Sequence, residues 1–270
     1  MAAKGYIGNS NNLSRKFKKA YIGNSSGLSI KAKKAYIGDS NNKSVLLWSG
    51  QIEAGYIAFT TSQVWTAPET MYIDIFCYGG GGGGTLGNGP GAGAGYTKTV
   101  LNYRVTKGTS YAVIIGAGGL SRSNGNGTPT CGGASSFGDI CIAYGGYAAV
   151  KSDNGSGVER TSCGGSGGGQ QYGGLGGTDG GDGQQGTNPN DFVTSTMCKG
   201  QGTTTRAFSE SSGTLYCTGG DSHADNTLTT YPTAGNSNTG DGGDSGTYNG
   251  VHGGNGGSGG VIIRWSTQEV

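Results

Sequence analysis

Two pairs of aspartates come nearest, by type and spacing, to a site of chemistry. Asp179 with Asp182 and Asp241 with Asp244 each occur as Asp-Gly-Gly-Asp. Carboxylates in glycine turns can bind calcium, and paired acids serve glycoside hydrolysis. No aromatic platform for a sugar lies beside them in the sequence. We therefore expect aspartates that close turns or face water, and no metal site.

Other catalytic patterns are incomplete. The two histidines, His223 and His252, lie in glycine-rich loops with little to orient a Ser-His-acid site. The stretch 76–95 (FCYGGGGGGTLGNGPGAGAG) has glycines like a dinucleotide fingerprint, but strand-forming residues follow where that motif needs a helix. The sequence therefore predicts a protein that is not an enzyme and binds no cofactor.

The six cysteines form no close pair of the kind that a structural zinc site uses. We expect buried free thiols, with a disulfide formed after release from the cell left open as an alternative. The N-terminal segment MAAKGYIGNS lacks the apolar stretch of a secretory signal, which favours a chain that is made and kept in a cytoplasm until something other than secretion releases it.

Composition limits the classes of protein further. Glycine fills 61 of 270 positions, while 32% of residues are hydrophobic and 13% are charged, so a conventional enzyme core is not expected over much of the chain. A net charge of +2 argues against charge-driven disorder, and five prolines are too few for collagen. The apolar runs are too short to cross a membrane.

Glycines recur at every third residue in the second half of the chain. Three is the repeat of the polyproline II helix, and glycine on its faces lets neighbouring backbones approach closely. We interpret these tracts as an ordered bundle of polyproline II helices rather than a flexible Gly-Ser linker, because linkers seldom keep a triplet register. The predicted scaffold glycines are Gly174, Gly177, Gly180, Gly183, Gly186, Gly250, Gly253, Gly256 and Gly259.

Strand patterns frame these tracts, and no segment has a helical apolar period. Strands are expected at 55–60, 70–78, 96–105, 110–116, 140–144 and 260–265. The predicted fold class is all-β with a polyproline II glycine bundle, N-terminal β-hairpin repeats and almost no α-helix. We divide the chain into a basic repeat module, 1–50, and a glycine-rich β/polyproline II domain, 51–270.

The repeat module holds three copies of a 15-residue unit that reads strand, turn, strand. Its nine Lys or Arg and one acid give a charge of +8. We interpret it as an attachment module that docks onto an acidic partner. Solvent-facing strand lysines and nucleic-acid contact are the alternatives, and the absence of a cluster for base reading disfavours nucleic acid. The attachment candidates are Tyr6, Tyr21, Tyr36, Lys18, Lys19, Lys33 and Lys34.

Segments between the tracts are richer in side chains and are the candidates for recognition. They are 121–130, 147–162, 187–199, 203–217 and 221–238. Loops on a rigid frame often carry binding, and tyrosine among Ser, Gly and Asn is the chemistry of antibody loops. For each aromatic, packing beneath its own loop is the alternative. The receptor-binding candidates are Tyr147, Asp153, Phe192, Phe208, Tyr216 and Tyr231.

Four stretches together resemble the glycine-rich domain of bacteriophage tail proteins, over about residues 56–265. They are FTTSQVWTAPETMYIDIFCYGGGGGG (59–84), VTKGTSYAVIIGAGG (105–119), GGASSFGD (132–139) and GGNGGSGGVIIRW (253–265). The tract architecture is also similar to the adhesins at the tips of T-even-like tail fibres, in which glycine polyproline II helices display variable loops. The KKAYIG repeats are similar to segments of structural proteins from phages of Gram-positive hosts.

The resemblance implies a virion component that binds a bacterial surface. We expect a tail adhesin whose partners are other virion proteins, bound through the repeats, and a bacterial surface glycan or protein. Homo-oligomeric or multivalent display is expected, with no membrane insertion and no nucleic acid bound. A purely structural virion protein is the main alternative. An ice-binding glycine-helix protein is a third, disfavoured by the missing signal peptide and the scattered cysteines.

Overall fold

The structure is a computed structural model. It describes residues 21–23, 29–31, 34–38, 44–49, 51–86, 89–121, 128–149, 162–170, 173–186, 198–223, 232–247 and 252–269. The predicted site residues Tyr6, Lys18, Lys19, Lys33, Asp153, Phe192, Tyr231 and Gly250 lie outside these ranges.

The second and third repeats of the N-terminal module form β-hairpins. β1 (Tyr21–Gly23) pairs antiparallel with β2 (Ser29–Lys31), and β3 (Lys34–Gly38) pairs antiparallel with β4 (Ser44–Ser49). In both, the Tyr-Ile-Gly triplet is the first strand and the end of the same unit is the second. Each of these two units thus contains the two strands predicted from the repeat, and the predicted turn between them lies outside the described residues.

Two antiparallel four-stranded sheets form the frame of the glycine-rich part. The first has the order β6-β13-β8-β9, and the second has the order β12-β11-β10-β7. The strands of the first sheet are β6 (Gly55–Phe59), β8 (Met71–Tyr78), β9 (Thr97–Val105) and β13 (Gly260–Trp265). Those of the second are β7 (Gln63–Thr66), β10 (Ser110–Ile114), β11 (Ser135–Phe137) and β12 (Cys141–Ala143).

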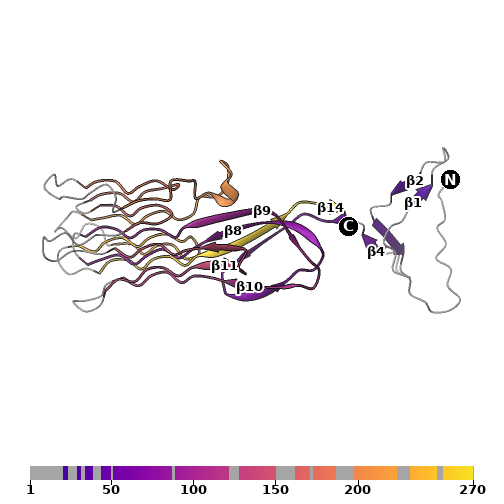
Figure 1. Cartoon of the computed structure of the whole chain (residues 1–270), viewed down its shortest axis with the longest axis horizontal. Helices are drawn as coiled ribbons and strands as arrows, with labels where there is room; N and C mark the ends of the chain where they lie inside the picture. The colour runs from indigo at the N-terminus through magenta and orange to yellow at the C-terminus, as the bar shows by residue number, and fades with distance from the viewer. Residues whose placement is uncertain are drawn as a thin grey trace.

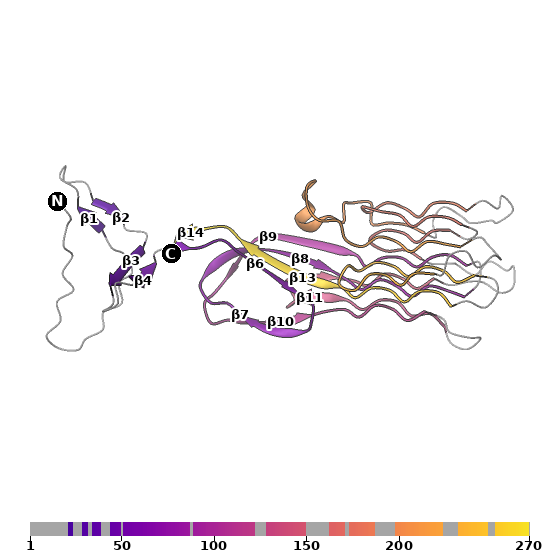
Figure 2. The same ribbon diagram turned by 180° about the vertical axis from the view of Figure 1, so that it is seen from behind.

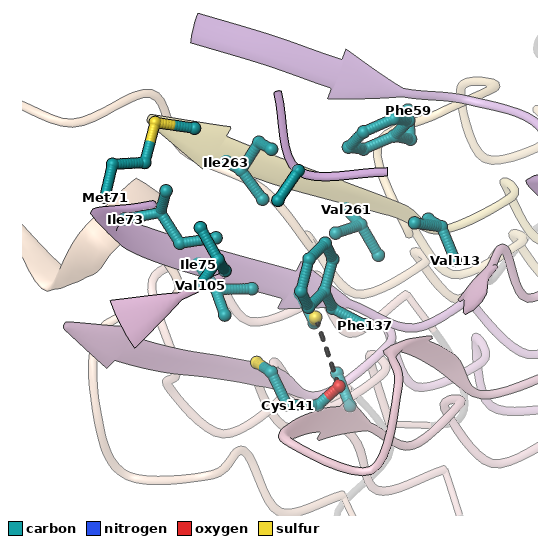
Figure 3. Close-up of a cluster of buried hydrophobic side chains, with 13 residues drawn as sticks. Phe59, Met71, Ile73, Ile75, Val105, Val113, Phe137, Cys141, Val261 and Ile263 are labelled. Carbon is teal, nitrogen blue, oxygen red and sulfur yellow. Dashed lines mark hydrogen bonds between the residues drawn. The ribbon is translucent and has the colours of Figure 1, made fainter. Parts of the chain in front are cut away.

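The main hydrophobic core lies between these sheets (Figure 3). Successive side chains of a strand point to opposite faces, so Ile73, Ile75 and Cys77 of β8 share the inner face. They pack against Val113 and Phe137 of the second sheet. The packing of the two sheets therefore depends on side chains at every second position of β8, a spacing that can be recognised in the sequence.

The opposite face of β8 carries a second, smaller cluster. Phe76 and Tyr78 point outward there and are covered by Phe208, at 6% exposure, and by Tyr216. These covering side chains come from an excursion of the chain, residues 203–217, which contains the short 3₁₀ turn η1 (Ala207–Ser209). We call this segment the sheet flap. It makes both faces of β8 buried over their distal half.

The glycine tracts continue the strands and run together away from the sheets, on the side opposite β14 (Gln268–Glu269) (Figures 1 and 2). β14 pairs with β5 (Gln51–Ile52), which brings the two ends of the glycine-rich part together. The all-β fold class is confirmed: among the described residues, η1 is the only helical turn. The polyproline II conformation of the tracts stays a prediction.

Candidate functional site

The central glycine tract, residues 79–84, donates its amide hydrogens in a three-residue repeat. From Gly79 to Gly84 the accepting carbonyls are those of Tyr96, Gly133, Gly257, Gly93, Thr130 and Gly254, at 2.9–3.0 Å. Each partner segment accepts again three residues further along the tract, and its accepting residue then has a lower number. The three segments that accept from this tract therefore run antiparallel to it.

The carbonyls of the same tract accept from three further segments. Gly80 and Gly83 accept from Gly146 and Ala149, and the other donors are Gly119 to Gly81, Gly243 to Gly82 and Gly246 to Thr85. Where a segment donates twice, its donor has a higher residue number at the second bond, so these segments run parallel to the tract. Six segments thus surround one tract, an arrangement that needs bonds pointing in several directions rather than in the plane of a sheet.

Burial follows the glycine register that the sequence predicts. Gly174, Gly177, Gly180 and Gly183 are buried, whereas the residues between them are exposed or half-buried. This run is not one rod, however. Asp179 and Gly180 have φ of 52° and 84°, and Gly181 donates to Thr178, so the chain reverses there and pairs with itself. The three-residue spacing of buried glycines therefore continues through the turn, because Gly183 is buried again after it.

Described residues in or near four of the recognition segments lie at a common end of the bundle. The described residues beside them are joined by backbone hydrogen bonds: Gly83 with Thr130 and Ala149, Thr85 with Gly246, Asp221 with Ser245, Gly174 with Ser222, and Gln170 with Gln184. We call these residues the bundle end. Ser222 also donates through its hydroxyl to the Gly89 carbonyl at 3.0 Å. The segments therefore start from fixed positions that lie close together.

The Asp-Gly-Gly-Asp carboxylates hold neighbouring tracts together. Asp182 accepts from the Lys199 ammonium at 2.6 Å and from the Gly200 amide at 2.9 Å. Asp179 accepts from Thr204, from the Thr205 amide and from Arg206.

In the second pair, Asp241 accepts from the Thr218 amide, and Asp244 accepts from the amides of Asp221 and Thr233. With these partners all four carboxylates act as anchors between tracts, a role that differs from the turn closing or exposure to water expected from the sequence.

A hollow of about 390 Å³ opens on the side of the bundle. We call it the tyrosine groove; its lining includes Tyr96, Cys131, Gly132, Tyr144, Gly145 and Tyr147. Tyr144 is 69% exposed and Tyr147 is 48% exposed, while Tyr96 is half-buried. Burial raises the pKa of the Tyr96 phenol, and the nearby Cys163 and Tyr147 add to the effect. Its hydroxyl therefore stays protonated and able to donate at neutral pH.

Comparison with known protein families bears on this architecture. The family described as a glycine-rich domain matches residues 58–266, which include all the described tracts and both sheets except the first three residues of β6. The chain belongs to the glycine-rich domain family. No curated protein matches it.

The predicted receptor-binding aromatics that the structure describes lie in two different places. Tyr147 is exposed beside the tyrosine groove. Phe208 and Tyr216 lie in the sheet flap and pack against Phe76, with ring centroids 5.8 and 5.6 Å away. For these two, the alternative of packing beneath their own loop describes what the structure shows. The segment 203–217 accordingly lies against a sheet and not at the bundle end.

Sequence reasoning missed Tyr96, Tyr144 and Cys131 as surface residues of the glycine-rich domain. One signal was present: Tyr144 and Tyr147 are three residues apart in a tract whose backbone bonds repeat every three residues. The partner tracts that complete the groove were not predictable from spacing within one segment.

The His, Cys, Asp and Glu side chains of the described residues decide whether the domain could hold a metal ion. No group of three or more His, Cys, Asp or Glu side chains that could hold a metal occurs among them. Within the same residues, no helix is long and apolar enough to cross a membrane. Cys77, Cys141, Cys198 and Cys217 are buried free thiols, Cys131 is an exposed free thiol, and Cys163 is half-buried. Burial raises the pKa of the Cys198 thiol to about 11.

The anchoring carboxylates give the domain an expected sensitivity to acid. The hydrogen bond from Thr204 and that from Lys199 are the main causes that lower the pKa values of Asp179 and Asp182. A carboxyl with a lowered folded-state pKa adds stability above its unfolded pKa, about 4, and loses it as pH falls through the folded value. We expect the melting temperature to fall as pH drops below about 4.

Asp182→Asn tests this expectation by calorimetry over a pH series. Because the Asp182 side chain is 49% exposed, its loss should cost no more than about 1 kcal/mol at neutral pH. The acid slope of the melting temperature should become shallower, and exposed Asp139→Asn should leave it unchanged. An unaltered slope in Asp182→Asn would count against the anchoring role.

Proposed function

We propose that this chain is a tail adhesin of a bacteriophage or phage-derived particle, which binds a bacterial surface receptor without catalysing a reaction. The convergence of the recognition segments on the bundle end is the observation that carries the proposal. Three of the five predicted segments contain residues of the bundle end, and a fourth, 187–199, begins three residues after Gln184. Loops fixed at both ends on a rigid support lose little conformational entropy on binding.

The opposite end of the domain suits attachment. β5 and β14 pair there, so the polypeptide enters and leaves the domain at one place, away from the bundle end (Figure 1). The basic repeats precede β5 in the chain. A domain anchored at one end and free at the other presents its bundle end outward, and several copies on a particle add their weak contacts. The particle's other structural proteins are the proposed partners of the repeats.

Binding of the purified full-length chain to a panel of whole Gram-positive bacterial cells tests the proposal. We expect saturable binding to some strains and not to others. Replacing 187–197 and 224–231 by Gly-Ser sequences of equal length should reduce that binding at least about tenfold, the equivalent of 1.4 kcal/mol. The replacements leave every described tract unchanged, so the melting temperature should stay near that of the original chain.

A surface change at the other end of the domain is the matched control. Leu101→Ser, at a position 58% exposed on β9, should bind cells as the original chain does. Loss of binding in this control as well would point to general surface adhesion and contradict the proposal. If no strain binds the chain although it assembles into particles, the purely structural alternative replaces the adhesin.

A further inference from the structure

The tyrosine groove combines exposed aromatic rings with a floor of bare backbone. Hydrogen bonds between tracts fix its walls: the Tyr96 amide donates to the Tyr144 carbonyl at 2.9 Å, and the Gly132 amide donates to Gly146 at 2.9 Å. The Gly93 amide donates to the Tyr147 carbonyl at 3.1 Å. The groove is therefore a preformed feature of three adjoining tracts.

Two of its tyrosines are exposed without a packing role that explains them. Tyr144 and Tyr147 are three residues apart, and their carbonyls bond to one tract, 91–96, in the three-residue repeat. Their side chains therefore leave the same face of their tract. With an extended rise of about 3.1 Å per residue, the two ring positions are separated by roughly 9 Å along it, about the length of a disaccharide.

The floor of the groove offers hydrogen-bonding groups that the fold leaves unused. Among the described residues, the backbone amides of Cys131 and Gly145 donate to no carbonyl, although the amides of Gly132 and Gly146 beside them do. Together with the phenol hydroxyls they supply donors and acceptors to a ligand. None of the residues lining the groove is charged.

These features together select one kind of occupant. An anion or cation would find no opposite charge here, and a peptide strand needs a row of alternating edge groups rather than two separate amides. A sugar ring has an apolar face that stacks on an aromatic ring and hydroxyls that bond to amides and phenols. We propose that the tyrosine groove binds a neutral oligosaccharide. That the sugar belongs to a bacterial surface glycan rests on the proposed function.

The exposed thiol of Cys131 reports on occupancy of the groove. The rate of its alkylation by N-ethylmaleimide is measured by mass spectrometry on the full-length chain. The probes are an array of neutral mono- to tetrasaccharides of hexoses, 6-deoxyhexoses and N-acetylhexosamines. A sugar present at twice its Kd leaves one third of the sites free, so we expect alkylation to slow about threefold.

Variants separate the groove from other effects. Tyr144→Ala with Tyr147→Ala should abolish the protection, whereas Tyr144→Phe, which keeps the aromatic face, should retain most of it. Tyr56→Ala is the matched control, because Tyr56 is 59% exposed on β6 and is not one of the residues that line the groove. The alkylation rate without sugar shows that each variant keeps the groove.

Several results would overturn the inference. They are an array in which no neutral sugar protects Cys131, protection that persists in the double alanine variant, and protection by charged sugars alone. A rate that falls with protein concentration instead would assign the groove to contact between copies. If the chain binds cells but no sugar protects Cys131, the proposed function stands and this inference is wrong. If a sugar protects Cys131 but the chain binds no cells, this inference stands and the proposed function is wrong.

Discussion

Replacing Gly82 by alanine is expected to unfold the glycine bundle or to lower its melting temperature by more than about 6 °C, at 2–4 °C for each kcal/mol in a domain of this size. A Cβ atom at this position would lie 2.2 Å from the Tyr147 carbonyl oxygen and 2.5 Å from its carbon. The Tyr147 carbonyl already accepts from Gly93, so it cannot move without losing that bond. Overpacking usually costs about 1–3 kcal/mol, and we expect a cost of at least about 3 kcal/mol here because the nearest atoms belong to the peptide between Tyr147 and Ala148 and not to a movable side chain.

Gly108→Ala is the matched control for this prediction. Gly108 has φ of 78° but no atom within 4 Å of the position of a Cβ, so only conformational strain of about 1–2 kcal/mol is expected. Calorimetry of the two variants compares the loss of melting temperature caused by a backbone clash at residue 82 with the loss caused by conformational strain at residue 108. Equal melting temperatures would mean that the tracts can separate to accept a methyl group, and the packed bundle would then be a wrong description.

The strand patterns of the sequence were enough to predict six of the eight strands of the two four-stranded sheets. β6, β8, β9, β10, β12 and β13 all lie within segments that alternate or are rich in β-branched and aromatic residues. β7 and β11 were missed, because four residues such as Gln63–Thr66, or three such as Ser135–Phe137, carry too little pattern to be told from a loop.

The order of the tracts in the bundle lay beyond sequence reasoning. Spacing within a segment predicts which face of Gly79–Gly84 is bare, but it does not say that tract 91–96 is one neighbour and tract 254–257 another. Those choices depend on carbonyls far away in the chain. The position of the sheet flap was unpredictable for the same reason, since Phe208 finds Phe76 across 132 positions of sequence. The tyrosine groove could not be predicted for the same reason, because it is formed by three neighbouring tracts.

The sheet flap is held on β8 by a combination of contacts whose loss should destabilise the domain strongly. Phe208 packs on Phe76, and the guanidinium carbon of Arg264 lies 3.9 Å from the centre of its ring. Arg264 also donates to Asp74 of β8 at 3.1 Å and to Glu210 of the flap at 2.6 Å. Phe208 adopts φ of 57°, a strained conformation for a bulky residue, which these contacts must offset.

Phe208→Ala is therefore expected to destabilise the domain by about 3–5 kcal/mol, the usual cost of removing a buried phenylalanine. Alanine keeps the unfavourable φ but loses the ring contact, so nothing compensates for the cavity. Urea unfolding measures the change, and Leu101→Ala, at a side chain 58% exposed on β9, is the control that should cost little. If Phe208→Ala unfolds at the same urea concentration as that control, the flap is not docked on β8, and Phe208 returns to the receptor-binding candidates.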